Sequence, residues 1–355
     1  MSMKHPEGIK KKRSTYWPHN PCCQAANHIC ANIDGNYFQL IYCKAQRKEY
    51  RKLNNVFIIT LGMICLGYLL KILGIFKEKD GEVIAKIVFN LTLPALFFTN
   101  FSQAELEFSL IWLSIIAILF NLFMIAIGLL VYRKEERRLK GMYVIMLPVG
   151  NGLFFFPLVE AIWGSTGLVH FGMFDMANAF TLYCISYFIA NYFSVGKGKA
   201  DYKYIGSRML KSAPLMTYVV VILINLLGIN LPEIFLQLTG TIAQANMPLT
   251  FFMVGLYLNF NFDIKQVKDM AKVIGIRYIA GLTVGVALLF ILPFSSLFKY
   301  IVLCALLLPT PAVLIPYAIE FDYDIKLIAA ISNATIILSF FILWIIVGIL
   351  PPLSL

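Results

Sequence analysis

Prolines and small polar residues meet in one segment of the sequence in a pattern that could bind an anion. Gly150, Asn151 and Gly152 lie between Pro148 and Pro157. Proline removes an amide donor and clashes with the preceding turn, and glycine weakens a helix further, so a helix through this segment should be interrupted. The half-helix that resumes has free N–H groups and partial positive charge at its first turn. With the Asn151 amide as a further donor, the segment predicts a site for a small organic anion such as a carboxylate.

A second segment repeats this pattern nearer the C-terminus. Pro309, Thr310 and Pro311 are followed by Val313 and Pro316. We expect Thr310, Pro311 and the backbone around Val313 to face the first segment, so that both line one binding site. The expected helix-breaking residues are four prolines: Pro148, Pro157, Pro309 and Pro316.

An acidic residue interrupts one of the apolar segments. Asp175 lies one turn before Asn178, so the two side chains share a helix face. An acid at the centre of a bilayer costs about 2.5–3.5 kcal/mol, so it needs a partner or a function. Two interpretations stay open, a role in proton coupling or gating and a hydrogen bond that packs helices. Arg277 and Lys86 lie nearer the ends of their apolar segments, from which their long side chains can reach the membrane surface.

The elements that position these residues follow from composition. The 355-residue chain is 59% hydrophobic and 14% charged, which excludes an ordinary soluble protein. Apolar windows of about 20 residues, long enough to cross a bilayer as helices, recur from residue 55 onward. They predict an all-α, multi-pass protein with ten spans: 55–76, 83–101, 110–132, 141–161, 167–193, 212–231, 234–258, 273–292, 300–319 and 327–350.

The spans show an internal repeat. The motif Pro-x-x-Phe-Phe begins at Pro94 and again at Pro248, 154 residues later, and Pro148 recurs as Pro309 after 161 residues. A five-span unit is odd, so two copies in tandem face opposite ways across the membrane. We therefore predict an inverted repeat of residues 53–193 and 212–355, joined by a linker at 194–211. A single proline more simply kinks a packed helix, but equivalent prolines in both units favour broken helices 4 and 9.

Loop charges orient the spans. Sixteen Lys and Arg lie in the loops that follow spans 1, 3, 5, 7 and 9, and only Lys299 lies in the loops of the other face. The positive-inside rule then places the linker 194–211 in the cytoplasm and both ends of the membrane domain outside a cell membrane.

The first 52 residues conflict with this orientation, because they carry ten Lys or Arg. Four of the seven cysteines and three of the four histidines also lie here, but their spacing fits no zinc pattern, so we predict no metal and no cofactor. We expect residues 1–52 to be a disordered extension or sequence joined by a misassigned start.

The motifs resemble the auxin efflux carrier family, which includes plant PIN proteins and microbial malate and malonate permeases. The similar stretches are Gly62–Gly74, Val88–Ala95, Gly150–Leu153 leading to Pro157-Leu158, Asp175–Asn178, Asn225–Pro232 and Met247-Pro248 leading to Val254–Leu256. The resemblance covers about residues 54–350. It implies ten helices, crossed broken helices 4 and 9, alternating access between two helix groups, and a substrate-facing asparagine at Asn151. The linker is short, as in microbial permeases, and lacks the large cytoplasmic loop of long PIN proteins. The basic N-terminal segment is not a feature of the family.

Other functions find little support. No zinc-protease, serine-hydrolase or phosphate-loop motif is present, so we predict no enzyme activity. The net charge of +11 lies in loops and the N-terminal segment, which argues against nucleic acid as a partner. The expected partners are the lipid bilayer and a small carboxylate, with a homodimer left open. A channel, sensor or scaffold remains the alternative to a carrier, and the substrate, coupling ion and direction stay undetermined.

Overall fold

A computed structural model describes residues 35–102, 104, 107–150, 152–194, 206–207, 210–259, 266–311 and 313–350, with side chains from Tyr50 onward. The chain divides into two compact units, Met1–Arg51 and Lys52–Leu355, and the second unit carries the segments of interest. The predictions for residues 1–34, for Asn151 and for most of the linker concern residues outside those that the structure describes.

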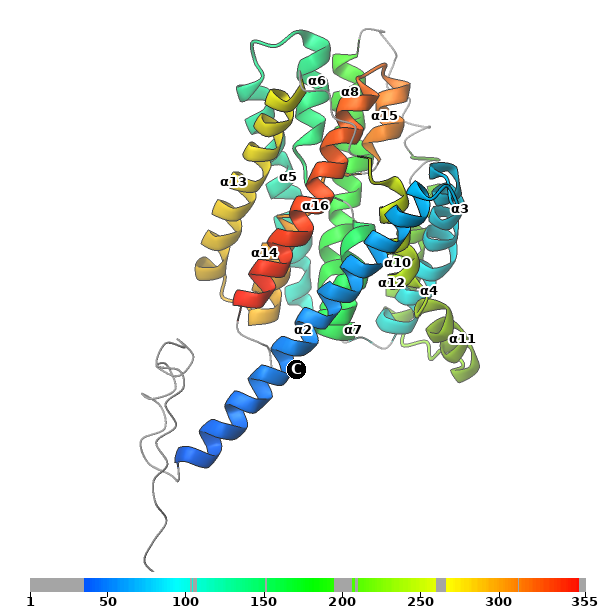
Figure 1. Cartoon of the computed structure of the whole chain (residues 1–355), viewed down its shortest axis with the longest axis vertical. Coiled ribbons are helices and arrows are strands. Elements are labelled where there is room, and N and C mark those ends of the chain that lie inside the picture. The colour runs from blue at the N-terminus through cyan, green and yellow to red at the C-terminus, as the bar shows by residue number, and fades with distance from the viewer. Residues whose placement is uncertain are drawn as a thin grey trace, which may run out of the picture. The chain divides into compact units, whose positions relative to one another are not determined.

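Within the described residues every regular element is helical and no strand occurs (Figure 1). The α-helices are α2 (Gly35–Ile72), α3 (Glu78–Ile87), α4 (Leu93–Phe101), α5 (Ile111–Val131), α6 (Arg137–Met146), α7 (Gly152–Phe180), α8 (Tyr187–Phe193), α10 (Ala213–Leu226), α11 (Glu233–Ala243), α12 (Asn246–Tyr257), α13 (Val267–Ile291), α14 (Ser296–Ala305), α15 (Leu314–Glu320) and α16 (Ile325–Ile349). Two π-helical turns, Val88–Thr92 and Thr181–Ser186, and a 3₁₀ turn, Phe108–Leu110, connect some of them.

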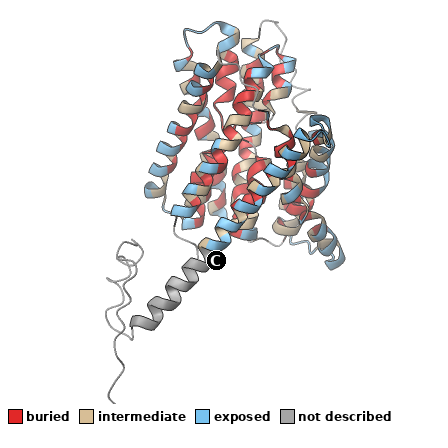
Figure 2. Ribbon diagram, viewed as in Figure 1, coloured by how far each residue is buried: buried red, intermediate tan, exposed pale blue. Residues whose placement is uncertain are grey.

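Six of the described helical stretches are long and apolar enough to cross a membrane: Tyr50–Ile72, Glu78–Phe101, Phe108–Val131, Gly152–Phe193, Val267–Ile291 and Ile325–Ile349. In the Lys52–Leu355 unit, buried residues lie on the faces that meet other helices and exposed ones lie on the outer faces (Figure 2). Those outer faces carry large apolar side chains, including Leu119, Ile279 and Phe290. An apolar surface of this kind needs lipid rather than water as its solvent.

Helix α7 is a hairpin rather than one straight helix. Its backbone leaves helical geometry at Gly164, where φ is +63° and ψ is −157°, a combination that only glycine adopts without strain. The chain reverses there, because the Asp175 carboxylate of the second limb lies against Gly152 at the start of the first limb. The two limbs correspond to the end of expected span 4 and to span 5.

The second and seventh expected spans are also interrupted. A π-helical turn precedes Pro94, because that proline provides no N–H for the carbonyl of Asn90. The seventh span is divided into α11 and α12 by a turn at residues 244–245, an interruption that the sequence did not predict. The Asn246 amide at the start of α12 donates to Thr92 Oγ1 over 3.0 Å and so joins the two interrupted spans.

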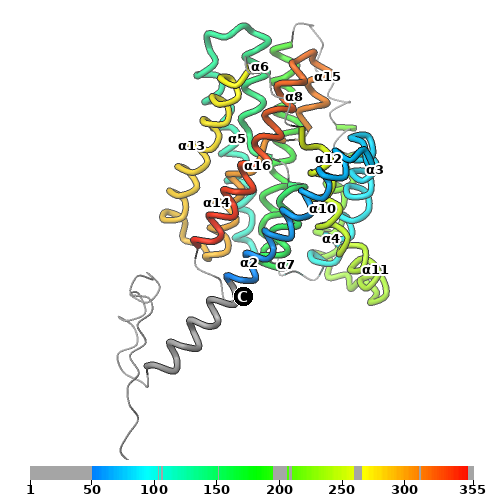
Figure 3. The backbone as a smooth tube through the Cα atoms, viewed as in Figure 1, coloured from blue at the N-terminus to red at the C-terminus, as the bar shows by residue number. Residues whose placement is uncertain are grey.

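Two glycines let α2 and α12 cross with their backbones in contact. A Cβ added at Gly67 would overlap the carbonyl of Phe252, and one added at Gly255 would overlap the carbonyl of Ile64. Small residues at a membrane helix crossing permit this approach. On the opposite part of this unit, α13, α14 and α16 pack together (Figure 3).

Candidate functional site

Two non-helical segments of the second unit meet inside the protein. Helix α6 ends at Met146 and α7 begins at Gly152, while α14 ends at Ala305 and α15 begins at Leu314. The segments touch at Gly150, where an added Cβ would lie only 2.6 Å from Cγ of Pro311. Two of the predicted site residues are therefore neighbours, and any side chain larger than glycine at position 150 would push the segments apart.

The prolines have different positions relative to these segments. Pro148, Pro309 and Pro311 lie between helices. Pro157 lies inside α7 and Pro316 is the third residue of α15, so neither of these two ends a helix at its own position. Pro316 is tolerated because an amide in the first turn of a helix has no helical partner. Pro157 is the sixth residue of α7 and leaves the carbonyl of Leu153 without its helical donor.

Polar side chains of neighbouring helices bind the exposed backbone of both segments. Asn121 Oδ1 on α5 accepts a 3.0 Å hydrogen bond from the amide of Val149. Thr335 Oγ1 on α16 accepts one of equal length from the amide of Thr310. Backbone amides inside a bilayer have no water to bind, so these side chains stabilise the irregular backbone at this depth.

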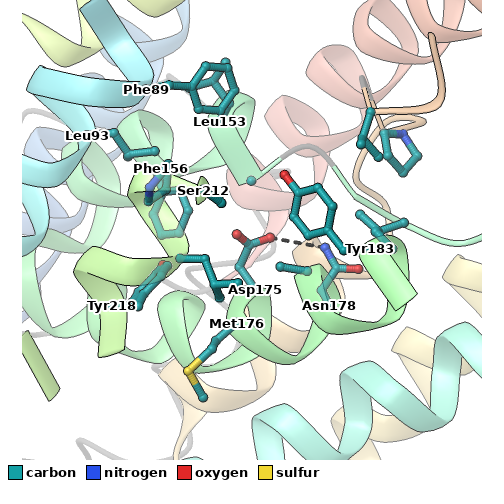
Figure 4. Close-up of a pocket in the computed structure, with 17 residues that line it drawn as sticks. Phe89, Leu93, Leu153, Phe156, Asp175, Met176, Asn178, Tyr183, Ser212 and Tyr218 are labelled. Carbon is teal, nitrogen blue, oxygen red and sulfur yellow. Dashed lines mark hydrogen bonds between the residues drawn. The ribbon is translucent and has the colours of Figure 1, made fainter. Parts of the chain in front are cut away.

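A buried polar network extends from the first segment to the acid of α7. Asn121 Nδ2 donates to Asn178 Oδ1 over 2.8 Å. Asn178 Nδ2 in turn donates to Asp175 Oδ1 over 3.1 Å, as Figure 4 shows. The hydrogen bond from Asn178 agrees with the helix face that the two residues were expected to share. Asp175 also lies against Gly152, in the first turn of α7, where a Cβ would overlap the carboxylate. The acid thus occupies the end of a half-helix that favours negative charge.

A cavity of about 120 Å³ opens beside this network. Its lining includes Gly152, Asp175 and Asn178 from α7, and Pro311 and Val313 from the second segment. Tyr218 of α10 and Phe156 lie on another side of the carboxylate in Figure 4. A space of this size holds several water molecules, so the cavity has room for a small polar ligand in contact with both segments.

Two other predicted residues have restricted roles in this geometry. Asn151 lies outside the described residues, so its position relative to the cavity stays a prediction. Thr310 is fully buried, and its hydroxyl has no hydrogen-bond partner among the described residues. Thr310 is not among the residues that line the cavity, so its role as a ligand donor stays a prediction.

Three residues of the site were not predicted. Asn121 could have been found, because it is the one amide side chain within the apolar span 110–132. Tyr218 carries no signal in the sequence that separates it from other tyrosines. Arg277 was expected to reach the membrane surface, but it is only 2% exposed and donates to backbone carbonyls of both segments, so that expectation is wrong.

Comparisons with known proteins agree with the motifs. The sequence model of a family described as membrane transport protein matches residues 53–201. An uncharacterized transporter of Methanothermobacter thermautotrophicus is 26% identical over 289 residues, which cover 79% of this chain and 92% of the relative. An uncharacterized transporter of Methanocaldococcus jannaschii is 22% identical over 291 residues, covering 78% and 92%.

The match to the family model covers the first non-helical segment and the helices around it. These similarities favour transport over an enzyme and over the sensor or scaffold alternative, and with the apolar helices they identify a multi-pass membrane protein. The resemblance inferred from the motifs is confirmed: the first part of the chain is similar to a family of membrane transport proteins, and most of the chain is similar to two archaeal transporters, which supports a permease of the auxin efflux carrier type.

Proposed function

We propose that this protein carries a small mono- or dicarboxylate across the membrane and binds it in the cavity where the two non-helical segments meet. The observation that carries this proposal is the contact of Gly150 with Pro311 beside the Asp175–Asn178 pair. The first turn of α7 offers free amides and partial positive charge at this place. Asn151 and the Thr310 hydroxyl are the proposed donors to the substrate carboxylate.

The carboxylate of Asp175 sets a condition on anion binding. A substrate carboxylate in the same cavity would lie near a second negative charge, and like charges this close disfavour each other. A proton on Asp175 removes the repulsion and turns the acid into a hydrogen-bond donor. We propose that the anion and a proton bind together, which assigns Asp175 and Asn178 to coupling and gives proton symport.

The positions of the cavity and the aromatic side chains support alternating access. On α4, the buried ring of Phe97 lies between Leu93 of the candidate cavity and Asn100 of a second, polar cavity. On the second limb of α7, the buried ring of Phe171 lies between His170 of the polar cavity and Asp175 of the candidate cavity. The rings pack closely, with centroids 4.0 Å apart for Phe97 and Tyr218 and 4.6 Å apart for Phe156 and Phe171. They separate the candidate site from the second cavity, which is lined by residues such as Asn100 and His170.

The candidate cavity is also lined by Ser212, which directly follows the basic linker 194–211. With the linker in the cytoplasm and both ends of the membrane domain outside, the site opens inward and the aromatic rings close it from the outside. In this proposal the ten spans form two inverted units, and broken helices 4 and 9 exchange access between the two sides. The polar cavity is then the outer entrance.

Counterflow in proteoliposomes tests the proposal. Vesicles loaded with unlabelled malonate, succinate, malate, pyruvate or lactate are placed in the labelled compound, and saturable uptake of at least one acid is expected. Failure of every acid in a folded preparation would contradict the carboxylate assignment.

Asp175→Asn tests the coupling step, with Asp322→Asn as the matched control because Asp322 is an exposed acid outside the site. In the Asp175 variant the accumulation driven by a pH gradient should disappear, while exchange at equal pH continues. The control variant should behave as the parent. Gradient-driven accumulation that survives in Asp175→Asn would remove the acid from the coupling mechanism.

A further inference from the structure

Arg277 of α13 lies at the point where both non-helical segments end their first helices. Its Nη1 is 2.8, 2.7 and 2.6 Å from the carbonyl oxygens of Met146, Leu147 and Pro148. Its Nη2 is 2.8 Å from the carbonyl oxygen of Leu308. One side chain, 2% exposed, thus binds backbone from both segments at once.

These carbonyls are the unpaired acceptors at the carboxyl ends of α6 and α14, where a helix carries partial negative charge. Three of them surround Nη1, which has only two protons to donate, so at least one proton is shared. The number of carbonyl oxygens around Nη1 thus exceeds the number of its protons, so the positive charge of the guanidinium accounts for their arrangement better than one hydrogen bond per proton does. No ion pair joins Arg277 to an acid among the residues that the structure describes. The helix ends are therefore the main counter-charge of the guanidinium.

Helix α13 is placed to bring the guanidinium there. Gly281, one turn beyond Arg277, packs on the second segment so closely that a Cβ would lie 2.6 Å from the carbonyl oxygen of Leu306. The Tyr278 hydroxyl lies 2.9 Å from the backbone oxygen of Thr335 and 2.6 Å from Ser339 Oγ, and Ser339 Oγ lies 2.7 Å from the carbonyl oxygen of Leu307. The two hydroxyl protons serve these three contacts. The helix is therefore fixed against the second segment within the turn that follows the arginine.

Carbonyls of unwound helices and half-helix carboxyl ends are the groups that bind the coupling Na⁺ in many secondary transporters. We propose that Arg277 is a built-in cation that fills such a site permanently, so that the crossing of the two segments forms without a bound alkali ion. The inference rests on the proposed transport function only where it says that transport needs no coupling alkali ion. The site itself is a property of the folded chain.

The proposal makes a specific prediction about the empty site. Without the arginine, four carbonyl oxygens would face a space with no positive charge, and a small cation should bind there. Lysine at the same position keeps the charge, although it cannot reach all four carbonyls in the same way. Charge, rather than guanidinium geometry alone, should therefore decide whether the segments hold together.

The test uses the purified full-length protein and needs no carboxylate. Parent, Arg277→Ala, Arg277→Lys and the control Lys272→Ala are compared, because Lys272 is an exposed cation on the same helix. Thermal unfolding is measured in sodium chloride against choline chloride at equal ionic strength, with radioactive sodium binding as a second readout.

The parent and the control should show the same Tm in both salts and no saturable sodium binding. Arg277→Ala should melt roughly 5 °C or more below the parent in choline chloride. Sodium, or millimolar guanidinium, should recover a large part of this difference. Arg277→Lys should melt between the two and stay insensitive to sodium.

Two results would overturn the inference. One is sodium binding or a sodium-dependent Tm in the parent protein. Either would show that a sodium ion binds even though Arg277 is present, so that the arginine does not take its place. The other is a lysine variant as unstable as the alanine variant, with neither responding to sodium or guanidinium, which would make Arg277 a purely geometric hydrogen-bond donor. If Arg277→Ala does not fold, the parent and Arg277→Lys measurements still decide between these outcomes. Loss of carboxylate transport alone changes none of these readouts, so failure of the proposed function is distinguishable.

Discussion

Asn121 offers the most direct test of how the first non-helical segment is held. Its amide makes two buried hydrogen bonds, one from the amide of Val149 at 3.0 Å and one to Asn178 at 2.8 Å. Substitution by alanine removes both and leaves the Val149 amide without its acceptor. Side-chain hydrogen bonds between membrane helices contribute about 0.6–1.7 kcal/mol each, so Asn121→Ala should lower the free energy of unfolding by about 1–3 kcal/mol.

The effect on the site should exceed the effect on stability. Asn178 loses the donor that orients it, so its hydrogen bond to Asp175 weakens, and the Val149 backbone becomes free to shift beside Gly150. We expect carboxylate affinity, measured by calorimetry or scintillation proximity, to fall by at least the factor of about ten that 1.4 kcal/mol represents. Asn121→Asp, which keeps the acceptor for Val149, should lose less stability than Asn121→Ala.

Asn225→Ala is the matched control for this experiment. Asn225 of α10 also holds irregular backbone, because its amide donates to the carbonyls of Phe101 and Ala104 at 2.9 and 2.8 Å. The control should lose similar stability but keep carboxylate affinity. Equal losses of affinity in both variants would refute the reasoning, since they would show that general destabilisation and not the Asn121 network sets binding.

The remaining predictions concern the cavity and the N-terminal unit Met1–Arg51. Gly152→Ala should displace the Asp175 carboxylate and change the pH dependence of exchange, whereas Gly62→Ala, which has open space around it, should not; unchanged pH dependence in both would separate the acid from the first turn of α7. Asn151→Ala should weaken carboxylate binding by roughly ten- to a hundredfold in an affinity measurement with little change in Tm, and parental affinity would place the site elsewhere. Pro309→Ala should slow counterflow more than it weakens binding, because a helix could re-form across the break; parental flux would show that the proline is dispensable. Deletion of residues 1–51 should leave the Tm and counterflow of the remaining unit nearly unchanged, and loss of folding would contradict this.

The sequence predicted the long helices and the interrupted ones to different degrees. Continuous apolar windows placed spans 110–132, 273–292 and 327–350 within a few residues of α5, α13 and α16, apart from the start of α13. These helices are uniform along their length, so composition alone locates them. The turn between α11 and α12 was missed, because no proline or glycine lies at residues 244–245, and Pro248 acts from three residues further on.

The candidate site was predictable where the chemistry is local. Pro148, Pro309 and Pro311 lie within the two non-helical segments, as the sequence indicated, whereas Pro157 and Pro316 lie inside helices. Arg277 shows the opposite case, because its distance from the end of a span says nothing about the carbonyls that two other helices bring to it. Its role depends on contacts across 129 to 131 residues of sequence, and only the folded chain reveals them.

The glycine contact between α2 and α12 has a consequence for movement. With the Phe252 carbonyl against Gly67 and the Ile64 carbonyl against Gly255, no side chain separates the two backbones. A shift of either helix by one residue would replace a glycine at the crossing with a larger residue such as Tyr68, and main chain would collide with side chain. The two helices are therefore held in a single register. In the proposed alternating-access mechanism, the displacement would arise among the helices that surround Arg277 and Asp175.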